Sequence, residues 1–369
     1  MDAVYLHHIE TCVPEHAFSQ ILLCEQMQHW AKTERERRYI RGIYPASGIE
    51  TRHFVVSDDG TEPSGIYCRD GMMAPPTVPG TEARNAVYVE ASKQMAVDVA
   101  RRVFEGCEAM DAADVTHVIV VSCTGFYNPG PDYYIAQALD LSPGVERYCL
   151  GFMGCHAALP ALKMATQFCR ADPDAVVLVV CVELCSLHLQ FDGRPDSLVA
   201  NALFSDGAVA AIVSARTPVD GQCAYRLDGF ASALVAEGEK VMAWAIGDRG
   251  FRLTLSSYVP KIIGANIRSL LIPVLASWDL GISDVSLWAV HPGGKTILDR
   301  IEEELNLHPE QLLVSRNILQ HHGNMSSATV LFVLQELLNS GASGPVCTLA
   351  FGPGLTVEMG HLHLVSGDG

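Results

Sequence analysis

The chain has 369 residues, of which 49% are hydrophobic and 18% charged, so it can bury a large core in two domains or one double domain. Its formal net charge of −17 argues against nucleic acid and against anionic membrane surfaces as general partners. We expect no signal peptide and no membrane span, because no basic segment precedes an apolar one at the N-terminus and apolar runs such as 175–182 are short.

Residues 19–40 predict one or two helices that end near Gly42, and 43–56 predict a loop followed by a strand. A loop rich in proline and glycine covers 68–82. Within it, Thr81 is placed to cap a long helix, because a threonine side chain can accept a hydrogen bond from the first turn.

Continuous runs of β-branched and other apolar residues predict fully buried strands at 115–123, 176–182 and 209–213. A short strand is predicted at 4–6, and a helix is predicted from about Asp132. These strands are too evenly apolar to have one face in water, so the sheet they form should be covered on both sides.

The second half of the chain alternates in the same way. We predict helices over 261–275, 295–305 and 325–338, and strands over 285–290, 347–351 and 355–365. Buried strands that alternate with helices indicate an α/β fold. No long linker separates the halves, and their internal likeness is only vague.

The 12 cysteines are scattered, and none of them forms a Cys-x-x-Cys pair. This pattern does not favour a zinc ribbon or a dithiol redox motif. Several cysteines lie in apolar runs, among them Cys123, Cys149 and Cys181. We therefore expect a reduced, cytoplasmic protein with free thiols and with no metal or redox cofactor.

The segment 150–159 joins an apolar run to a helix pattern of small residues, with Cys155 at the junction. The dipole and the unpaired N–H groups of a helix N-terminus favour a thiolate, which is the nucleophile of acyl transfer. Pro160 falls inside the pattern and should kink the helix or delay its start. Taken alone, inert packing is the commoner role of a cysteine in an apolar run.

Two later stretches support a catalytic role for Cys155. His291 closes a predicted strand and is followed by Pro292, Gly293 and Gly294, and ligands bind at the carboxyl ends of strands in α/β sheets. The two glycines allow a close approach of the backbone to a ligand. Asn324 follows a glycine and precedes small polar residues. The plainer interpretations are a hydrogen-bonded strand-end histidine and an asparagine helix cap.

A Cys, a His and an Asn, each beside glycine at an element junction, predict one site. The histidine can hold the thiolate as an ion pair, and the His and Asn N–H groups can hold an oxyanion on a thioester carbonyl. Spacing alone does not separate acyl transfer from proteolysis, because papain-like proteases carry the same three residues in the same order.

The chain resembles the type III polyketide synthases, the chalcone-synthase-like branch of the thiolase fold, over essentially its whole length. The segment Gly-Phe-Met-Gly-Cys-His is similar to bacterial rather than plant members. The motifs that carry the resemblance are at 154–155, 203–207, 291–294, 323–327 and 351–354.

The resemblance implies two similar α/β halves in a layered αβαβα architecture. Residues 1–225 would carry the nucleophilic cysteine, and 226–369 the histidine and asparagine. It further implies that Cys155 takes a starter acyl group from coenzyme A and holds the growing chain, with His291 keeping it as thiolate. His291 and Asn324 would bind the malonyl thioester carbonyl and stabilise the enolate formed on loss of carbon dioxide.

The resemblance also implies a substrate cavity and a homodimer. Phe204 matches a gatekeeper between a coenzyme A tunnel and the cavity. Asn128 matches the residue that crosses the dimer interface into the partner's cavity, with a cis peptide before Pro129. The residues that match cavity-lining positions are Cys123, Cys185, His188, Trp244, Leu253 and Ser326.

Four departures from the family pattern are visible, one of which is Ala350 in place of the first glycine of the C-terminal loop. The second gatekeeper phenylalanine is Leu253, and the small residue of the cavity floor is Trp244. Of the basic set that binds coenzyme A, only Arg38 and Arg41 are nearby, and the third position falls on Ala46. Beside Gly293 and Gly294, these two arginines are our candidates for coenzyme A contacts. The competing interpretation is a solvated helix face, because glutamates are interleaved with the arginines.

We therefore expect an acyltransferase that condenses an acyl-CoA starter with malonyl-CoA. The Trp244 indole should allow few extensions, so we expect a pyrone, resorcinol or phloroglucinol product. The alternatives are a ketoacyl synthase III-like enzyme that uses an acyl carrier protein or transfers one acyl group, and a Cys-His-Asn hydrolase. The papain-type Cys-Gly-Ser-Cys-Trp signature is absent, which disfavours the hydrolase. The starter, the number of extensions and the cyclisation route stay open.

Overall fold

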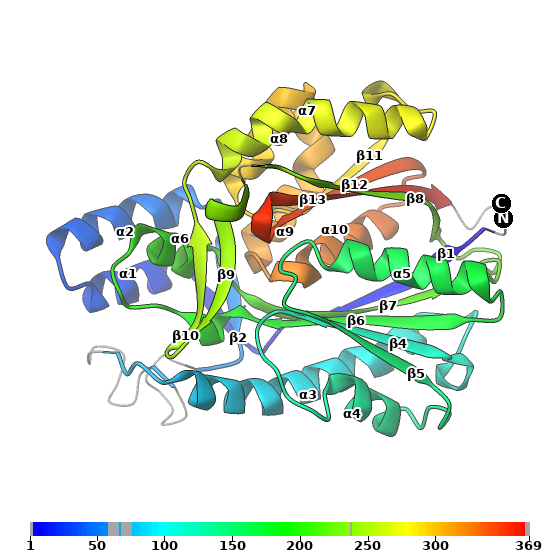
Figure 1. Ribbon diagram of the computed structural model, residues 1–369, viewed down its shortest axis with the longest axis horizontal. Coiled ribbons are helices and arrows are strands. Elements are labelled where there is room, and N and C mark those ends of the chain that lie inside the picture. Colours follow the sequence, from blue (N-terminus) through cyan, green and yellow to red (C-terminus); the bar gives the residue numbers. More distant parts are fainter. Residues whose placement is uncertain (1–2, 58–65, 68–75, 237, 366–369) are drawn as a thin grey trace.

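The computed structural model describes residues 3–57, 66–67, 76–236 and 238–365. Its helices and strands form five layers, with two helices between two sheets and further helices on both outer faces (Figure 1). The nine-stranded main sheet has the order β11-β12-β13-β8-β1-β7-β6-β4-β5, and β1 joins β8 through only two residue pairs. It therefore behaves as two sheets, one from each half of the chain.

The first sheet contains β1 (Tyr5–Cys12), β4 (His117–Ser122), β5 (Glu146–Gly151), β6 (Val176–Leu184) and β7 (Asp206–Ser214). The second contains β8 (Ala224–Leu234), β11 (Leu287–Val290), β12 (Gly344–Gly352) and β13 (Thr356–Val365). The strand order β4-β6-β7-β1 in the first sheet matches β11-β12-β13-β8 in the second. Each set has one parallel pair followed by two antiparallel pairs. The two halves thus repeat one topology, which the sequence showed only vaguely.

The helices complete the layers. The middle layer holds α5 (Ala158–Ala171) and α10 (Thr329–Leu338). One outer layer holds α3 (Thr81–Glu105) and α4 (Pro131–Ala138), and the other holds α7 (Val259–Ser277) and α8 (Lys295–Leu305). At one end of the layers lie four helices: α1 (Gln20–Trp30), α2 (Glu34–Ala46), α6 (Pro195–Leu203) and α9 (Leu313–His322). Two small two-stranded sheets lie at the same end. One pairs β2 (His16–Ser19) with β3 (Thr51–Phe54), and the other pairs β9 (Met242–Gly247) with β10 (Gly250–Leu255).

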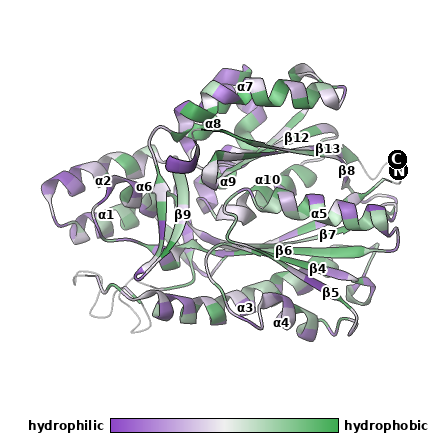
Figure 2. Cartoon of the chain, in the orientation of Figure 1, coloured by the Kyte–Doolittle hydropathy of each residue, from purple (hydrophilic) through white to green (hydrophobic). Residues whose placement is uncertain are grey.

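The core follows from the apolar pattern of these elements. Every residue of β6 and β7 is buried, as expected for strands covered on both faces. Apolar residues of α5 and α10 pack between the sheets, where small side chains such as Ala161 and Ala165 allow close approach. Figure 2 shows hydrophobic residues gathered in the strands and middle helices and hydrophilic ones on outer helices such as α2. This arrangement confirms the predicted α/β class.

Element boundaries differ from the predictions in several places. The helix α2 continues past Gly42 to Ala46, and Thr81 is the first residue of α3 rather than its cap. Most of the predicted loop at 68–82 lies outside the described residues. Pro160 stands in the first turn of α5, where a missing N–H has no helical partner to lose. The sequence did not predict β2, β5, β8, the β9–β10 hairpin, α6 or α9.

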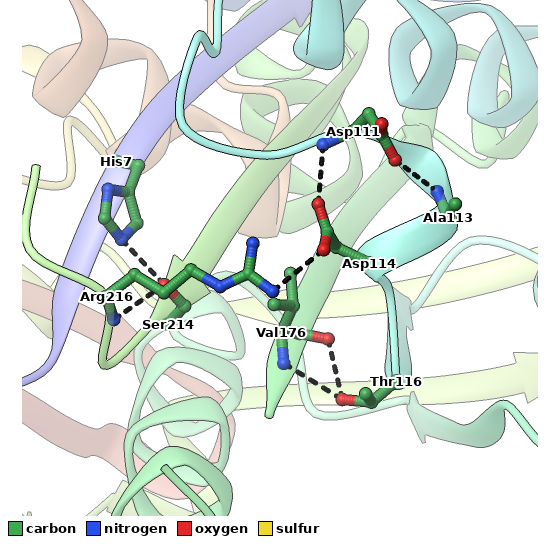
Figure 3. A network of polar contacts seen from close by, with 8 residues as sticks. All are labelled: His7, Asp111, Ala113, Asp114, Thr116, Val176, Ser214 and Arg216. Carbon is green, nitrogen blue, oxygen red and sulfur yellow. Dashed lines mark hydrogen bonds and ion pairs between the residues drawn. The ribbon is translucent and has the colours of Figure 1, made fainter. Parts of the chain in front are cut away.

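Polar contacts fix the first sheet at the end where β4 begins (Figure 3). Thr116 exchanges hydrogen bonds with the Val176 backbone, and a His7 ring nitrogen lies 2.9 Å from the Ser214 hydroxyl. Arg216 donates to Asp114 at 2.8 Å. The opposite end of the sheet, where β4 and β6 finish, is the end that carries the candidate site.

Among the residues that the structure describes, one helix, α7, is long and apolar enough to cross a bilayer by length and composition alone. The sequence analysis predicted this helix but no membrane span, because Lys261 and Arg268 interrupt its apolar run. Its buried residues, among them Ile263 and Leu271, pack in an apolar cluster with α8. Core helices pass the same test, so α7 is no evidence for a membrane span.

Candidate active site

Cys155 lies in a turn directly before α5, three residues ahead of the first helical residue. The turn is closed by a hydrogen bond from the Ala157 N–H to the Gly154 carbonyl at 3.1 Å. Gly154 has a φ of 88°, and a Cβ there would collide with the ring of Pro353. Glycine is therefore required in this turn, which presents the thiol at the end of the middle layer.

His291 and Asn324 reach the same place from the second half of the chain. His291 follows β11, and its N–H donates to the Leu349 carbonyl at 2.8 Å. Asn324 precedes a 3-10 turn at the start of α10; its side-chain oxygen accepts from the Ser326 N–H at 2.8 Å and its amide nitrogen is 3.4 Å from the Gly293 carbonyl. Asn324 is thus held against the loop that carries His291 and is not a helix cap.

Cys155, His291 and Asn324 line one inner cavity. Seven further residues predicted for the site also line it: Cys123, Cys185, Phe204, Trp244, Leu253, Gly293 and Ser326. The sequence did not predict the others, which are mainly apolar: Thr124, Gly154, Met242, Leu255, Ile297, Phe351 and Pro353. The structure therefore brings together the three residues on which the predicted chemistry depends.

An outer cavity adjoins the inner one, and both are lined by Leu255, Gly293 and Ile297. Gly294 and Ala46 lie in the outer cavity. Its basic residues are Lys261 at the start of α7 and Lys295 and Arg300 on α8. A ligand that bridges the two cavities would pass between α2 and α6 on one side and α7 and α8 on the other.

The two arginines predicted to contact coenzyme A lie elsewhere. Arg41 donates to Glu34 at 2.6 Å on an exposed face of α2, and Arg38 lines a separate surface groove between α2 and α6. Neither lines the inner or the outer cavity, because the face of α2 toward the outer cavity carries Ile43 and Ala46 instead. The contact of Arg38 and Arg41 with coenzyme A stays a prediction.

His188 stands behind the inner cavity rather than in its lining. Its Nε2 lies 2.7 Å from the Thr124 carbonyl, and its Nδ1 accepts from the Phe251 N–H at 3.0 Å. The ring stacks on Phe251 at 4.2 Å and meets the Trp244 ring edge-on at 5.7 Å. His188 therefore supports the cavity wall from behind.

Trp244 forms that wall. Its Nε1–H donates to the Cys123 carbonyl at 2.8 Å, which ties the β9–β10 hairpin to the end of β4. Its ring also meets Phe251 edge-on at 5.9 Å. A hydrogen bond and two aromatic contacts hold the indole in one orientation, so it occupies space in the cavity.

Burial controls the charges of the site. It raises the pKa of the Cys155 thiol to about 12, against hydrogen bonds from Ser326 and Asn324 that act in the opposite direction. Burial also lowers the pKa of His291 to about 3, with a smaller contribution from nearby His156. Burial therefore favours a thiol and a neutral imidazole, in opposition to the thiolate that we expected from the helix dipole.

Both ring nitrogens of His291 are buried without a hydrogen-bond partner among the residues that the structure describes. Buried polar groups are nearly always paired in folded proteins, so an unpaired imidazole beside a cavity indicates a ligand. A neutral imidazole can take a proton from a thiol and can also donate one N–H to a carbonyl oxygen. With the thiol and the Asn324 amide, the arrangement suits acyl transfer.

The sequence analysis missed one buried acid. Glu183 on β6 accepts from the Cys123 N–H at 3.0 Å, from the Thr124 hydroxyl at 2.9 Å and from the Ser327 hydroxyl at 2.6 Å. Burial raises its pKa. It joins the ends of β4 and β6 to the turn before α10, so it holds the Cys123 backbone and the Ser327 side chain in place. Its signal in the sequence is a lone acid in an otherwise apolar strand.

The family of the chain follows from two matches. Residues 3–217 match the N-terminal domain of chalcone and stilbene synthases, and residues 227–366 match the C-terminal domain of the same proteins. The chain belongs to the chalcone and stilbene synthase family. It is a type III polyketide synthase, an enzyme that transfers acyl groups, and this family uses acyl-CoA and malonyl-CoA substrates.

Relatives and solved structures agree with this assignment. The alpha-pyrone synthesis polyketide synthase-like Pks18 of Mycobacterium tuberculosis is 33% identical over 333 residues, 88% of this chain and 81% of that protein. The type III polyketide synthase domain of Steely1 from Dictyostelium has a TM-score of 0.88 at 28% identity, over 98% of this chain and 99% of the other. The 1,3,6,8-tetrahydroxynaphthalene synthase of Streptomyces coelicolor has a TM-score of 0.87 at 28% identity, with the same two coverages. The predicted thiolase-like fold is confirmed.

We predict that alkylation of Cys155 by iodoacetamide rises about ten-fold for each pH unit between pH 6 and 9, because the thiolate is a growing minority over that range. Peptide mapping by mass spectrometry gives the rate at this residue, and Cys155→Ala identifies its peptide. A rate that stays flat with pH would instead indicate a resting thiolate–imidazolium pair.

Proposed function

We propose that this type III polyketide synthase loads an acyl starter from coenzyme A on Cys155 and extends it with malonyl-CoA by decarboxylative Claisen condensation. The observation that carries the proposal is the meeting of Cys155, His291 and Asn324 in one buried cavity, with both His291 ring nitrogens unpaired within the described residues. No metal or redox cofactor is needed for these steps.

Loading begins from the neutral Cys155 thiol and the neutral His291 imidazole. The His291 imidazole takes the thiol proton while the Cys155 sulfur attacks the carbonyl carbon of the starter thioester. The carbon–sulfur bond to coenzyme A breaks, and the released thiolate takes the proton from the imidazolium. The mostly apolar lining excludes water, which protects the acyl-enzyme from hydrolysis.

Extension uses the same two N–H donors. His291 and Asn324 hold the malonyl thioester carbonyl, so that negative charge on its oxygen is stabilised when carbon dioxide leaves. The enolate carbon then attacks the acyl carbon on Cys155, and the Cys155 sulfur departs as thiolate. The lengthened chain is left on coenzyme A and returns to the cysteine for another round or cyclises.

The boundary between the two cavities supports a gate at Phe204. Phe204 lines the inner cavity, while its neighbour Leu203 lines the outer one. The outer cavity would hold the coenzyme A arm, with Lys261 and Lys295 near the phosphates in place of the arginines of α2. Lys295 also pairs with Asp299, whereas Lys261 forms no ion pair within the described part of the chain.

The cavity wall supports a short product. The held indole of Trp244 fills space that a small residue would leave open, so we propose few malonyl extensions and a pyrone, resorcinol or phloroglucinol product. The curated relative from Mycobacterium tuberculosis is named as an alpha-pyrone synthesis enzyme, which is consistent with a short chain.

We propose that the enzyme is a cytoplasmic homodimer. Phe126 and Tyr133, on either side of Asn128, are 42% and 38% exposed, and β5 is an edge strand of the main sheet. An exposed apolar loop beside an open strand edge is typical of an interface. The Asn128–Pro129 peptide is cis, as the resemblance implies, while the contact of Asn128 with a partner stays a prediction. The 11 described cysteines are all free, which fits a reduced compartment.

The runner-up is a ketoacyl synthase III-like enzyme with an acyl carrier protein as donor. It shares the three site residues and differs in what occupies the outer cavity. Assays with malonyl-CoA and with malonyl-carrier protein separate the two functions.

We predict that a panel of acyl-CoA starters gives an acyl adduct on Cys155 and that added malonyl-CoA releases a cyclised product. Cys155→Ala should abolish both. Asn324→Ala should still load but should lose about 10²-fold or more in malonyl-CoA decarboxylation, because one oxyanion donor is gone. Intact-protein mass spectrometry and product analysis give the result. Cys149→Ala, at an exposed cysteine, is the matched control and should load normally. Product formation by Cys155→Ala would contradict the proposal.

We predict that Trp244→Gly lengthens the products by one or more malonyl units, because removing the indole enlarges the inner cavity. Liquid chromatography with mass spectrometry measures the distribution of chain lengths. Ala243→Gly is the matched control, since it places the same residue on the same strand outside the cavity lining. An unchanged distribution in Trp244→Gly would show that the indole does not limit chain length.

We predict that Lys261→Ala combined with Lys295→Ala raises the KM for malonyl-CoA about ten-fold with little change in kcat, because two charge contacts to the phosphates are lost. Steady-state kinetics give both constants. Arg38→Ala with Arg41→Ala should leave the KM unchanged. A malonyl thioester of N-acetylcysteamine, which has no phosphates, should be equally active with all variants. A KM effect with that thioester would place the two lysines in another role.

A further inference from the structure

A fully buried arginine lies outside the cavity but against the backbone that carries two of its residues. Arg52 comes from β3 and is 1% exposed. Its Nη1 donates to the carbonyls of Asn201 at 2.7 Å and Phe204 at 3.0 Å, and its Nε donates to the Gln20 side chain at 2.9 Å. The guanidinium therefore touches the residue proposed as the gate.

Arg52 and its neighbours cap the C-terminus of α6. The last carbonyls of a helix lack helical partners, and a cation is favoured at that end. The Tyr44 hydroxyl donates to the Asn201 carbonyl at 3.1 Å, and the Gln20 amide donates to the Ala202 carbonyl at 2.8 Å. Side chains from α1, α2 and β3 thus determine where α6 ends.

The segment that follows α6 is paired with Asn324. The Ser205 N–H donates to the Asn324 carbonyl at 2.8 Å, and the Asn324 N–H donates to the Leu203 carbonyl at 3.0 Å. Phe204 and Asn324 are therefore bridged as two adjacent extended residues. Any shift in the end of α6 would move both the Phe204 ring and the Asn324 amide.

The surroundings of Arg52 indicate a positioning role rather than a salt bridge. Within the described residues, Arg52 forms no ion pair, although the buried Asp206 carboxylate interacts with it electrostatically from a longer distance. Its guanidinium lies over the rings of Tyr44 at 5.6 Å and Phe54 at 5.2 Å. A buried charge is costly and contributes little to stability that an apolar side chain could not supply. The N–H groups of its guanidinium fork donate to the carbonyls of Asn201 and Phe204, which an apolar side chain could not bind.

We propose that Arg52 is a positioning residue that holds the Phe204–Asn324 bridge, so that the Asn324 amide meets the malonyl carbonyl and the Phe204 ring bounds the cavity. The inference rests on the proposed function for the role of Asn324. It assigns to the reaction a residue that lies outside the linings of both the inner and the outer cavity.

The test compares two partial reactions in Arg52→Lys, which keeps the charge but loses the fork. We expect malonyl-CoA decarboxylation to fall about ten-fold or more, because a misplaced donor weakens transition-state binding. The rate of acyl loading on Cys155, measured by intact mass spectrometry and divided by the amount of folded protein, should change less than about two-fold. Gln20→Met, which removes the side-chain acceptor of Arg52, should shift the ratio of the two rates in the same direction by a smaller factor.

Arg84→Lys is the matched control. Arg84 is equally buried and donates to the carbonyls of Pro79 and Leu187, away from α6. It should lower thermal stability while leaving the ratio of decarboxylation to loading unchanged. If Arg52→Lys fails to fold, the ratio of the two rates in Gln20→Met decides whether Arg52 has a positioning role.

An unchanged ratio in Arg52→Lys and Gln20→Met, or an equal fall in Arg84→Lys, would overturn the positioning role. Failure of the proposed function would look different, because the unaltered enzyme would then neither load a starter nor decarboxylate malonyl-CoA.

Discussion

The packing of two helices between two sheets is the constraint on which this site depends. Because the halves repeat one topology, α5 and α10 occupy equivalent places in the middle layer. Cys155 stands just before α5, and Asn324 stands just before α10. The equivalent strands β4 and β11 are followed directly by Cys123 and His291, and both residues line the same cavity. The site is therefore built from two pairs of equivalent junctions that the repeat brings together.

Burial at that meeting point decides the electrostatics. It raises the pKa of the Cys155 thiol and lowers the pKa of His291, so it favours the neutral thiol and the neutral imidazole. The proposed chemistry can use this state, because charge then develops only during reaction, where fixed N–H donors face it. Polar links from Glu183 and the backbone of Asn324 keep the junctions in register.

Features of this chain adapt the family scaffold around that core. Trp244 is held by the Cys123 carbonyl and by aromatic neighbours, so the inner cavity has a rigid wall. The basic residues beside the outer cavity come from α7 and α8 rather than from α2. These differences do not involve Cys155, His291 or Asn324. The proposed specificity therefore depends on residues other than the three that carry the proposed chemistry.

The sequence by itself determined the α/β class, the buried strands and the three central residues, because apolar runs and glycine-flanked junctions are local signals. It also placed seven other residues of the inner cavity through resemblance to the family. Only the tertiary structure decided which face of α2 meets the outer cavity, that His188 stands behind Trp244, and that Glu183 and Arg52 tie distant segments together. These outcomes depend on contacts between residues far apart in the chain, for which a single sequence carries no local pattern.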